Sequence, residues 1–169
     1  VTDIKYDYNV TMNLYKSDTE KVVRVNPTTI FDAIGIGTSG ISNAYSNYMS
    51  NYDVFYEMLD NDELNKQQYD LIDGHWPEKY NEMVLIVDKN NQISDYTLYS
   101  LGILDQDYLK EQFINMTSGK EVKFEEHSYE TEELLGLSFK LVLNTDYYEK
   151  EKGIWINKSS DTEYMKKII

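Results

Sequence analysis

The segment DGHWPEKYNEMVLIVD, residues 73–88, places side chains capable of acid–base chemistry directly before a run of apolar residues. Its histidine, His75, has a carboxylate nearby on either side, Asp73 and Glu78. A histidine positioned among such partners can transfer protons near neutral pH. The segment is therefore either an active-site loop or a turn that directs an apolar strand into a core.

The backbone signals in this segment favour the structural turn. Gly74 suits a backbone conformation that other residues rarely adopt, and Pro77 restricts Trp76 to an extended conformation. We expect the turn to deliver residues 83–87 into the core as a strand, with Trp76 covering one end of the sheet. His75, which has no ligand partner at motif spacing, should then point to solvent.

The sequence GIGTSG, residues 35–40, matches the glycine-rich fingerprint of dinucleotide-binding sites. That fingerprint requires a strand before it and a helix N-terminus after it, where the pyrophosphate binds. Here a proline-initiated helix is expected before it, and serine and asparagine follow it. We therefore predict that Gly37 and its neighbours bind no nucleotide cofactor.

Residues 88–99, DKNNQISDYTLY, resemble a calcium loop because Asp88, Asn90 and Gln92 occupy alternate oxygen-bearing positions. The sixth position of such a loop should be glycine and is Ile93, and the twelfth should be a bidentate glutamate and is Tyr99. A polar connection between a strand and a helix explains the same residues, so no metal is predicted here.

No other constellation in the sequence selects a catalytic or metal-binding residue. His75 and His127 lie far apart without ligand spacing, the chain has no cysteine, and no serine sits in a G-x-S-x-G elbow. His127 is expected to be solvated, just before a helix capped by Ser128. We therefore assign no catalytic, cofactor-binding or metal residues, although thirty acidic residues leave room for a carboxylate pair of the glycosidase type.

Composition limits the classes of partner. The 169 residues suit one domain, 1–169, or two small lobes, and they can bury a core without disulfides. Thirty acidic against sixteen basic residues give a charge of -14, which repels nucleic acid. No stretch is long and apolar enough to span a bilayer, and the N-terminus lacks the features of a signal peptide. If the protein is exported, the segment is an excised part of a longer chain.

Short strands and helices are expected in the first half of the chain. Residues 22–25 are a strand candidate, and Asn26 and Pro27 predict that a helix of about two turns begins directly after it. A second helical face is expected over residues 54–59. Residues 82–88, EMVLIVD, form a nearly continuous apolar run and predict a strand buried on both faces.

Capping residues mark the helices of the second half. Ser94 and Asp105 each precede a helical pattern, and these patterns end at Gly102 and Gly119. Ser160, with an acidic residue three positions later, predicts the start of a last helix.

A β-hairpin is expected near the C-terminus. Residues 137–143 alternate in polarity as a strand does, with Leu137, Phe139, Leu141 and Leu143 on one face, and GIWIN follows a charged turn, EKEK. Strands and helices without regular alternation predict an α+β fold, a mixed sheet with short helices packed on it.

One long segment carries no charge. From Ala33 to Tyr52 glycine, serine, asparagine and tyrosine dominate, which predicts a loop. In so acidic a chain, an uncharged tract avoids desolvating charges on contact. We hypothesise that residues 35–51 meet a partner, a substrate or a neighbouring subunit, the alternative being an ordinary connection.

The stretch from Tyr69 to Ile103 resembles the extracytoplasmic part of MacB-like and FtsX-like ABC transporter permeases from Gram-positive bacteria. The matching pieces are Tyr69-Asp70, Gly74-His75-Trp76-Pro77, Asn81-Glu82-Met83-Val84-Leu85 and Leu101-Gly102-Ile103. The resemblance continues less specifically through residues 22–35 and 139–148.

The resemblance implies a noncatalytic domain, without cofactors, held on the extracellular face of the cell membrane between two transmembrane helices. Its partners would be an ATP-binding subunit or domain acting through the rest of the permease, and a second permease copy or an extracellular substrate or partner. The domain would bind that substrate or partner, or transmit ATP-driven motion outward. The alternative function is a secreted enzyme acting on carbohydrate or cell-wall polymers with paired carboxylates and an aromatic surface.

Overall fold

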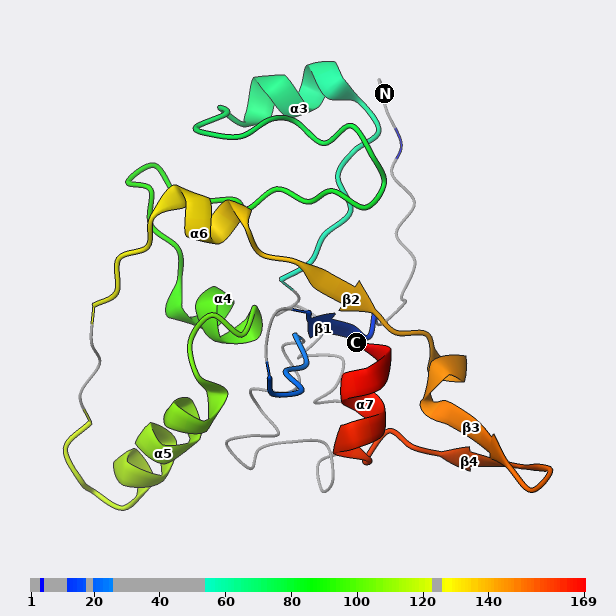
Figure 1. Ribbon diagram of the computed structural model, residues 1–169. Helices are drawn as coiled ribbons and strands as arrows, with labels where there is room; N and C mark the ends of the chain where they lie inside the picture. Colours follow the sequence, from blue (N-terminus) through cyan, green and yellow to red (C-terminus); the bar gives the residue numbers. More distant parts are fainter. Residues whose placement is uncertain (1–3, 5–11, 18–19, 26–53, 123–125) are drawn as a thin grey trace.

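The fold is mixed α+β, as the sequence predicts (Figure 1). The structure, a computed structural model, describes residues 4, 12–17, 20–25, 54–122 and 126–169. These residues contain five short helices and two antiparallel sheets of two strands each. The elements in chain order are β1 (Leu14–Lys16), α3 (Asp62–Gln68), α4 (Asp95–Ser100), α5 (Gln106–Thr117), α6 (Thr131–Leu135), β2 (Phe139–Leu141), the 3₁₀ helix η2 (Asn144–Tyr147), β3 (Tyr148–Glu151), β4 (Ile154–Asn157) and α7 (Thr162–Ile168).

The first sheet joins segments from opposite ends of the chain. Strand β1 pairs antiparallel with β2, and Tyr15 stands opposite Lys140. On the other side of β1, Tyr15 forms an isolated bridge with Arg24. Two backbone hydrogen bonds of 2.9 Å complete this contact, from Lys16 to Val23 and from Val25 to Leu14. The predicted strand at 22–25 is thus present as a short extended segment beside β1.

A small core forms where helix α7 packs on this sheet. Tyr15, Val142 and Met165 are buried together, and Ile168 and Ile169 pack against them. The predicted last helix is confirmed, but its cap is not Ser160. The Asp161 carboxylate accepts the N–H of Tyr164 at 3.1 Å, so the helix begins one residue later than expected.

A second buried group belongs to helix α4. Leu98, Tyr99 and Leu101 are each about 5–6% exposed. The turn after the helix approaches the extended segment beside β1 so closely that a Cβ on Gly102 would lie 2.7 Å from Val23 Cγ1. The Gln106 side chain reaches back to the Tyr99 carbonyl at 3.0 Å. Helix α4 therefore approaches the sheet through a tight glycine contact, and the start of α5 adds contacts from Gln106 to the Arg24 carbonyl and from Asp105 to Lys21.

The predicted caps of α4 and α5 are confirmed. The Ser94 hydroxyl accepts the N–H of Thr97 at 3.2 Å, and the Asp105 carboxylate accepts that of Asp107 at 2.8 Å. Both C-terminal glycines have positive φ, +66° at Gly102 and +70° at Gly119. Because capping is decided within a few residues, these boundaries could be read from local sequence.

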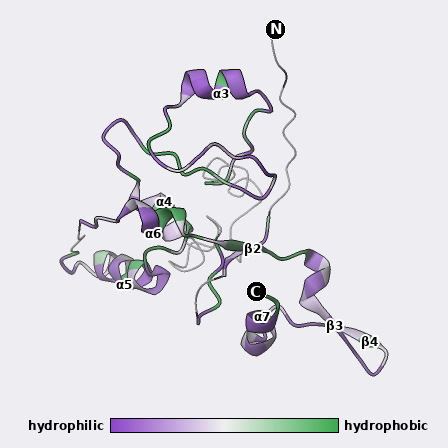
Figure 2. Cartoon of the chain, turned by 45° about the horizontal axis from the view of Figure 1, so that its top comes forward, coloured by the Kyte–Doolittle hydropathy of each residue, from purple (hydrophilic) through white to green (hydrophobic). Residues whose placement is uncertain are grey.

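The helix expected over residues 54–59 is absent, and helix α3 follows instead. The Asn61 side chain accepts the N–H of Leu64 at 3.1 Å and so sets the start of α3 at Asp62. Helix α3 is polar over most of its surface (Figure 2). Upstream of the cap, the Phe55 ring contacts Phe139 edge-on, with centroids 5.9 Å apart. Tertiary contact with β2 thus replaces the expected helix.

The strand predicted for residues 82–88 is also wrong. This segment forms no β-ladder, and Met83 and Ile86 are more than half exposed. An apolar run becomes a buried strand only when partner strands flank it. Neither sheet among the described residues reaches this segment, so it crosses the surface as extended chain.

The predicted hairpin exists, but with different strands. Residues 139–141 pair with β1, and the hairpin is made by β3 and β4, in which Lys150 stands opposite Trp155. Both turn residues, Lys152 and Gly153, have positive φ, as a two-residue type I′ turn requires. The charged sequence EKEK, which was predicted to form the turn, therefore lies mostly in strand β3.

The alternation expected in residues 137–143 fails at its end. Val142 is buried, 2% exposed, whereas Leu141 and Leu143 are about half exposed. The Val142 N–H donates to the Asn13 carbonyl at 2.9 Å, just beyond the end of the β1–β2 ladder. Val142, rather than the two leucines, consequently faces the core.

Substitution of Gly102 should test the contact between α4 and the sheet. Gly102→Ala adds a left-handed backbone penalty of about 1 kcal/mol and a clash with Val23 costing about 1–3 kcal/mol more. Gly119→Ala is the matched control, because φ is similar and nothing lies within 4 Å of the added Cβ. Urea unfolding should show Gly102→Ala to be the less stable of the two. Equal losses would mean that the contact contributes nothing.

Candidate functional site

The turn around His75 is closed by the carboxylate of Glu82. One Glu82 oxygen, Oε2, accepts the backbone N–H groups of Glu78 at 2.8 Å and Lys79 at 3.2 Å. The same oxygen lies 3.6 Å from His75 Nε2, and the histidine side chain is 69% exposed. Gly74 has φ +76°. The prediction of a locally encoded turn with a solvent-facing histidine is confirmed.

The electrostatics of Glu82 suit structure better than proton transfer. Hydrogen bonding from the backbone of Glu78 is the main cause that lowers the pKa of Glu82, helped by Lys79 and His75. A carboxyl group stabilised in its charged form is a poor general acid at neutral pH. Glu82 therefore fixes the turn and is not itself suited to donate a proton.

Trp76 does not cover the end of a sheet. Its side chain is half-buried, and no strand follows the turn. At Gly74, two residues earlier in the same turn, a Cβ would lie 3.5–3.6 Å from the methyl carbons of Leu135 in α6. The turn thus rests beside a short helix rather than on a central strand.

The calcium look-alike is a self-contained connection. One Asp88 oxygen accepts the N–H groups of Asn90 and Gln92, both at 2.8 Å, and Asn91 adopts φ +59°. The first oxygen of the candidate site is therefore occupied by the loop's own backbone. Among the described residues, no three His, Asp or Glu side chains are grouped as metal ligands.

The other sequence candidates do not converge with these. His127 is exposed, with its ring 6.4 Å from that of Tyr129, and α6 is capped at Glu130 without a side-chain bond rather than by Ser128. The GIGTSG sequence and the uncharged segment 35–51 lie outside the described residues, as does the helix expected after Pro27. His75, Asp88 and His127 belong to three separate local structures.

Sequence reasoning missed a polar cluster above the core, which we call the tyrosine cluster: Asn13, Tyr15, Arg24, Asn144 and Tyr147. The two phenol oxygens lie 3.0 Å apart, although the residues are 132 positions apart in the chain. Asn13 accepts from Arg24 Nη2 at 2.7 Å and donates to Asn144 at 2.7 Å. These contacts cross sequence distances that no local motif signals.

Within this cluster, partial burial keeps the Tyr147 phenol protonated. Desolvation, followed by the hydrogen bond with Tyr15, raises the pKa of Tyr147 far above its usual value, while Arg24 partly opposes the shift. Tyr147 therefore stays a neutral phenol at physiological pH. It can donate or accept a hydrogen bond, but it supplies no nucleophile, so the cluster orients β1, the 22–25 segment and η2 against one another.

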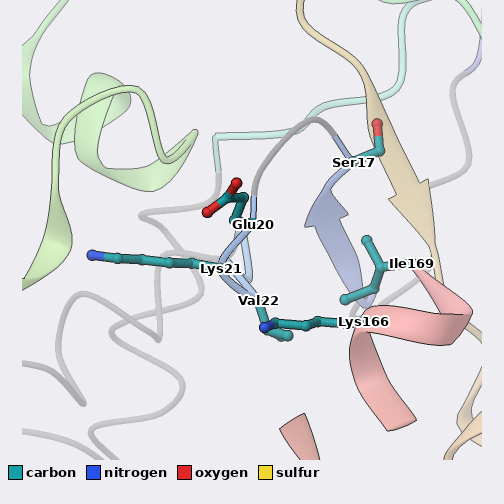
Figure 3. A pocket seen from close by; sticks show the side chains of 6 residues that line it. All are labelled: Ser17, Glu20, Lys21, Val22, Lys166 and Ile169. Atoms are coloured by element: carbon teal, nitrogen blue, oxygen red, sulfur yellow. The ribbon is translucent and has the colours of Figure 1, made fainter. Parts of the chain in front are cut away.

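A shallow pocket of about 350 Å³ lies beside the core (Figure 3). Its walls come from the loop after β1 and from α7: Ser17, Glu20, Lys21, Val22, Lys166 and Ile169. Lys21 lies 3.7 Å from the Asp105 carboxylate, and Lys166 lies 3.6 Å from that of Glu163. Both ammonium groups thus have acidic partners, and the pocket offers mixed charge without a reactive group.

Comparison of the chain with protein-family models, curated proteins and solved structures finds no match in any of the three. The resemblance to permease domains therefore rests on the sequence motifs alone. In the described part of the chain, no helix has the length and apolar character needed to cross a bilayer.

Two variants in the His75 turn should separate structure from chemistry. Trp76→Ala removes a half-buried aromatic group and should cost about 1–2 kcal/mol, less than full burial would give. His75→Ala changes an exposed side chain and should cost less than about 1 kcal/mol. Urea melts of both variants measure this difference. A stable Trp76→Ala protein beside a destabilised His75→Ala protein would overturn the assignment.

The stability of the protein at alkaline pH should depend on the partly buried Tyr147 phenol. Tyr147→Phe loses the hydrogen bond with Tyr15, which should cost about 0.5–1.5 kcal/mol near neutral pH. Because the folded-state pKa of Tyr147 is raised, the unfolded chain releases this proton first, and stability falls as pH rises above 10. The wild type should therefore lose stability more steeply there than Tyr147→Phe.

The fully exposed Tyr80 supplies the matched control. Tyr80→Phe should follow the wild type across the same alkaline pH series. If Tyr147→Phe and wild type lost stability in parallel, the phenol would not be coupled to folding.

Proposed function

We propose that this chain is a noncatalytic extracytoplasmic domain of a MacB-like or FtsX-like ABC transporter permease. In this function it is tethered to the membrane, works with an ATP-binding subunit or domain, and contacts a second permease copy, a substrate or an extracellular partner. It binds that substrate or partner, or it transmits ATP-driven motion outward. The observation that carries the proposal is the meeting of β1 and α7 in one core.

A domain inserted between two transmembrane helices must receive and return its chain on one side. The first described strand and the last helix support such an insertion, because Tyr15 and Met165 are buried in the same cluster and Ile169 packs on it. Ile169 also shares a pocket wall with Ser17, just after β1 (Figure 3). Strand β1 and the end of α7 therefore lie side by side, which supports an insertion whose chain enters and leaves on one side.

The polar groups of the described residues support a function based on contact. The Glu82 and Asp88 carboxylates bind backbone N–H groups of their own turns, and the Tyr15 and Tyr147 hydroxyls bind each other. Groups used in this way position backbone rather than substrate. Of the permease-like motifs between Tyr69 and Ile103, Gly74–Pro77 and Glu82 belong to the turn closed by Glu82, and Leu101–Ile103 directly follow α4, which supports a structural role for them.

These 169 residues contain no cysteine, so a thiol introduced into them can be followed in cells that carry the whole gene product. Ser160→Cys introduces one exposed thiol. A membrane-impermeant maleimide should label it in intact cells, and the labelled protein should sediment with the membrane fraction. The unsubstituted protein is the control for background labelling.

The other outcomes distinguish the alternatives. Labelled protein recovered only from the growth medium would favour the secreted enzyme that acts on carbohydrate or cell-wall polymers. A thiol that reacts only after the cells are permeabilised would place the domain on the cytoplasmic side. Either result would contradict the proposal.

A further inference from the structure

The hairpin β3–β4 exposes three consecutive apolar side chains. In both ribbon views it extends away from the other elements (Figures 1 and 2). The exposed fractions are 69% at Ile154, 64% at Trp155 and 39% at Ile156. A strand with one face on a core would alternate apolar and polar residues, so this strand does not follow the usual pattern.

The register places apolar groups on both faces of the hairpin. Because Lys150 pairs with Trp155 and Tyr148 with Asn157, these four residues share one face. Ile154 and Ile156, opposite Glu151 and Glu149, share the other. A flat protein surface could cover only one of these faces, whereas a surrounding medium of intermediate polarity would cover both.

The charges of the hairpin differ from those of the rest of the chain. Residues 148–158 contain three lysines and two glutamates, a net charge of +1 in a chain of -14. Lys158, at the base, lies 2.5 Å from the Glu151 carboxylate and 4.0 Å from that of Glu149. One ammonium group offsets only one of the two carboxylates, and Lys150 and Lys152 near the turn outnumber the negative charge that remains.

We propose that the tip of the β3–β4 hairpin inserts into the headgroup region of a phospholipid bilayer. Trp155 and Ile154 would lie at the boundary with the acyl chains, where tryptophan is favoured. Lys150 and Lys152 would extend to lipid phosphates, since lysine can bury its stem and keep its ammonium group in the polar layer. The acidic remainder of the chain would stay in water.

The same contacts disfavour two other occupants. A sugar stacked on this face of the Trp155 ring would have to displace Lys150 Nζ, which lies 5.9 Å from the ring centroid, whereas a lipid phosphate could pair with that ammonium group. A second copy would bring together two chains of charge -14, and a hairpin of two four-residue strands falls short of the roughly 800 Å² per partner of a stable interface.

Tryptophan fluorescence gives a direct readout, because the chain has only two tryptophans. Trp76→Phe leaves Trp155 as the sole reporter. On titration with vesicles of phosphatidylcholine and phosphatidylglycerol, its emission should shift to shorter wavelength and become quenched by brominated acyl chains. Trp155→Ala combined with Ile154→Ser, in the otherwise unaltered chain, should lower the sedimentation of protein with vesicles by roughly tenfold or more.

Helix α5 supplies the matched control. Ile114 and Met116 are exposed to 52% and 56%, so changing both to serine removes a similar amount of apolar surface elsewhere. This double variant should sediment with vesicles as the wild type does. Equal losses from both pairs of substitutions would mean that the binding is not located at the hairpin.

Several results would overturn the proposal. One is unchanged Trp155 emission in the presence of vesicles. Another is a shift that depends on protein concentration and accompanies a dimer in sedimentation, which would identify a second copy as the occupant. A shift produced by soluble oligosaccharides instead of vesicles would identify a sugar. Since the assay uses the chain alone, its outcome is independent of the proposed permease function.

Discussion

The packing of α7 against β1 is the contact on which the described fold depends. It brings Tyr15, Val142 and Met165 into one buried cluster, although these residues come from opposite ends of the chain. Closing so long a loop carries an entropic cost that grows only slowly with length, so a few well-packed side chains can offset it. The tyrosine cluster then adds polar contacts above the same point, where Tyr15 and Tyr147 meet.

Segments far from this contact maintain their shape by local means. The Glu82 carboxylate closes its own turn, and Asp88 does the same in the connection before α4. In α3, the buried Asn65 side chain donates to the Leu59 carbonyl at 2.8 Å. These local contacts accompany exposed apolar residues such as Ile72 and Met83, which lie outside the core.

Local chemistry was predictable from the sequence, and long-range pairing was not. The caps at Ser94 and Asp105 and the glycines that end α4 and α5 were read correctly, because each depends on neighbours within one turn. The partner of residues 139–141 was assigned wrongly, since antiparallel pairing with β1 depends on segments far away in the chain. The tyrosine cluster had no sequence signal for the same reason. Residues 82–88 were predicted as a strand from their apolar side chains, but no partner strand among the described residues pairs with them.

The hairpin β3–β4 joins the remainder of the fold at a single position. Tyr148 and Asn157 stand opposite each other across its base, and the Lys158 N–H donates to the Tyr147 carbonyl at 2.6 Å. The chain therefore leaves η2 and returns towards α7 at almost the same point, whatever lies between. Insertions or deletions within the hairpin can alter its reach while the path into α7 is unchanged. Changes in the length and side chains of the hairpin are therefore constrained separately from changes in the core.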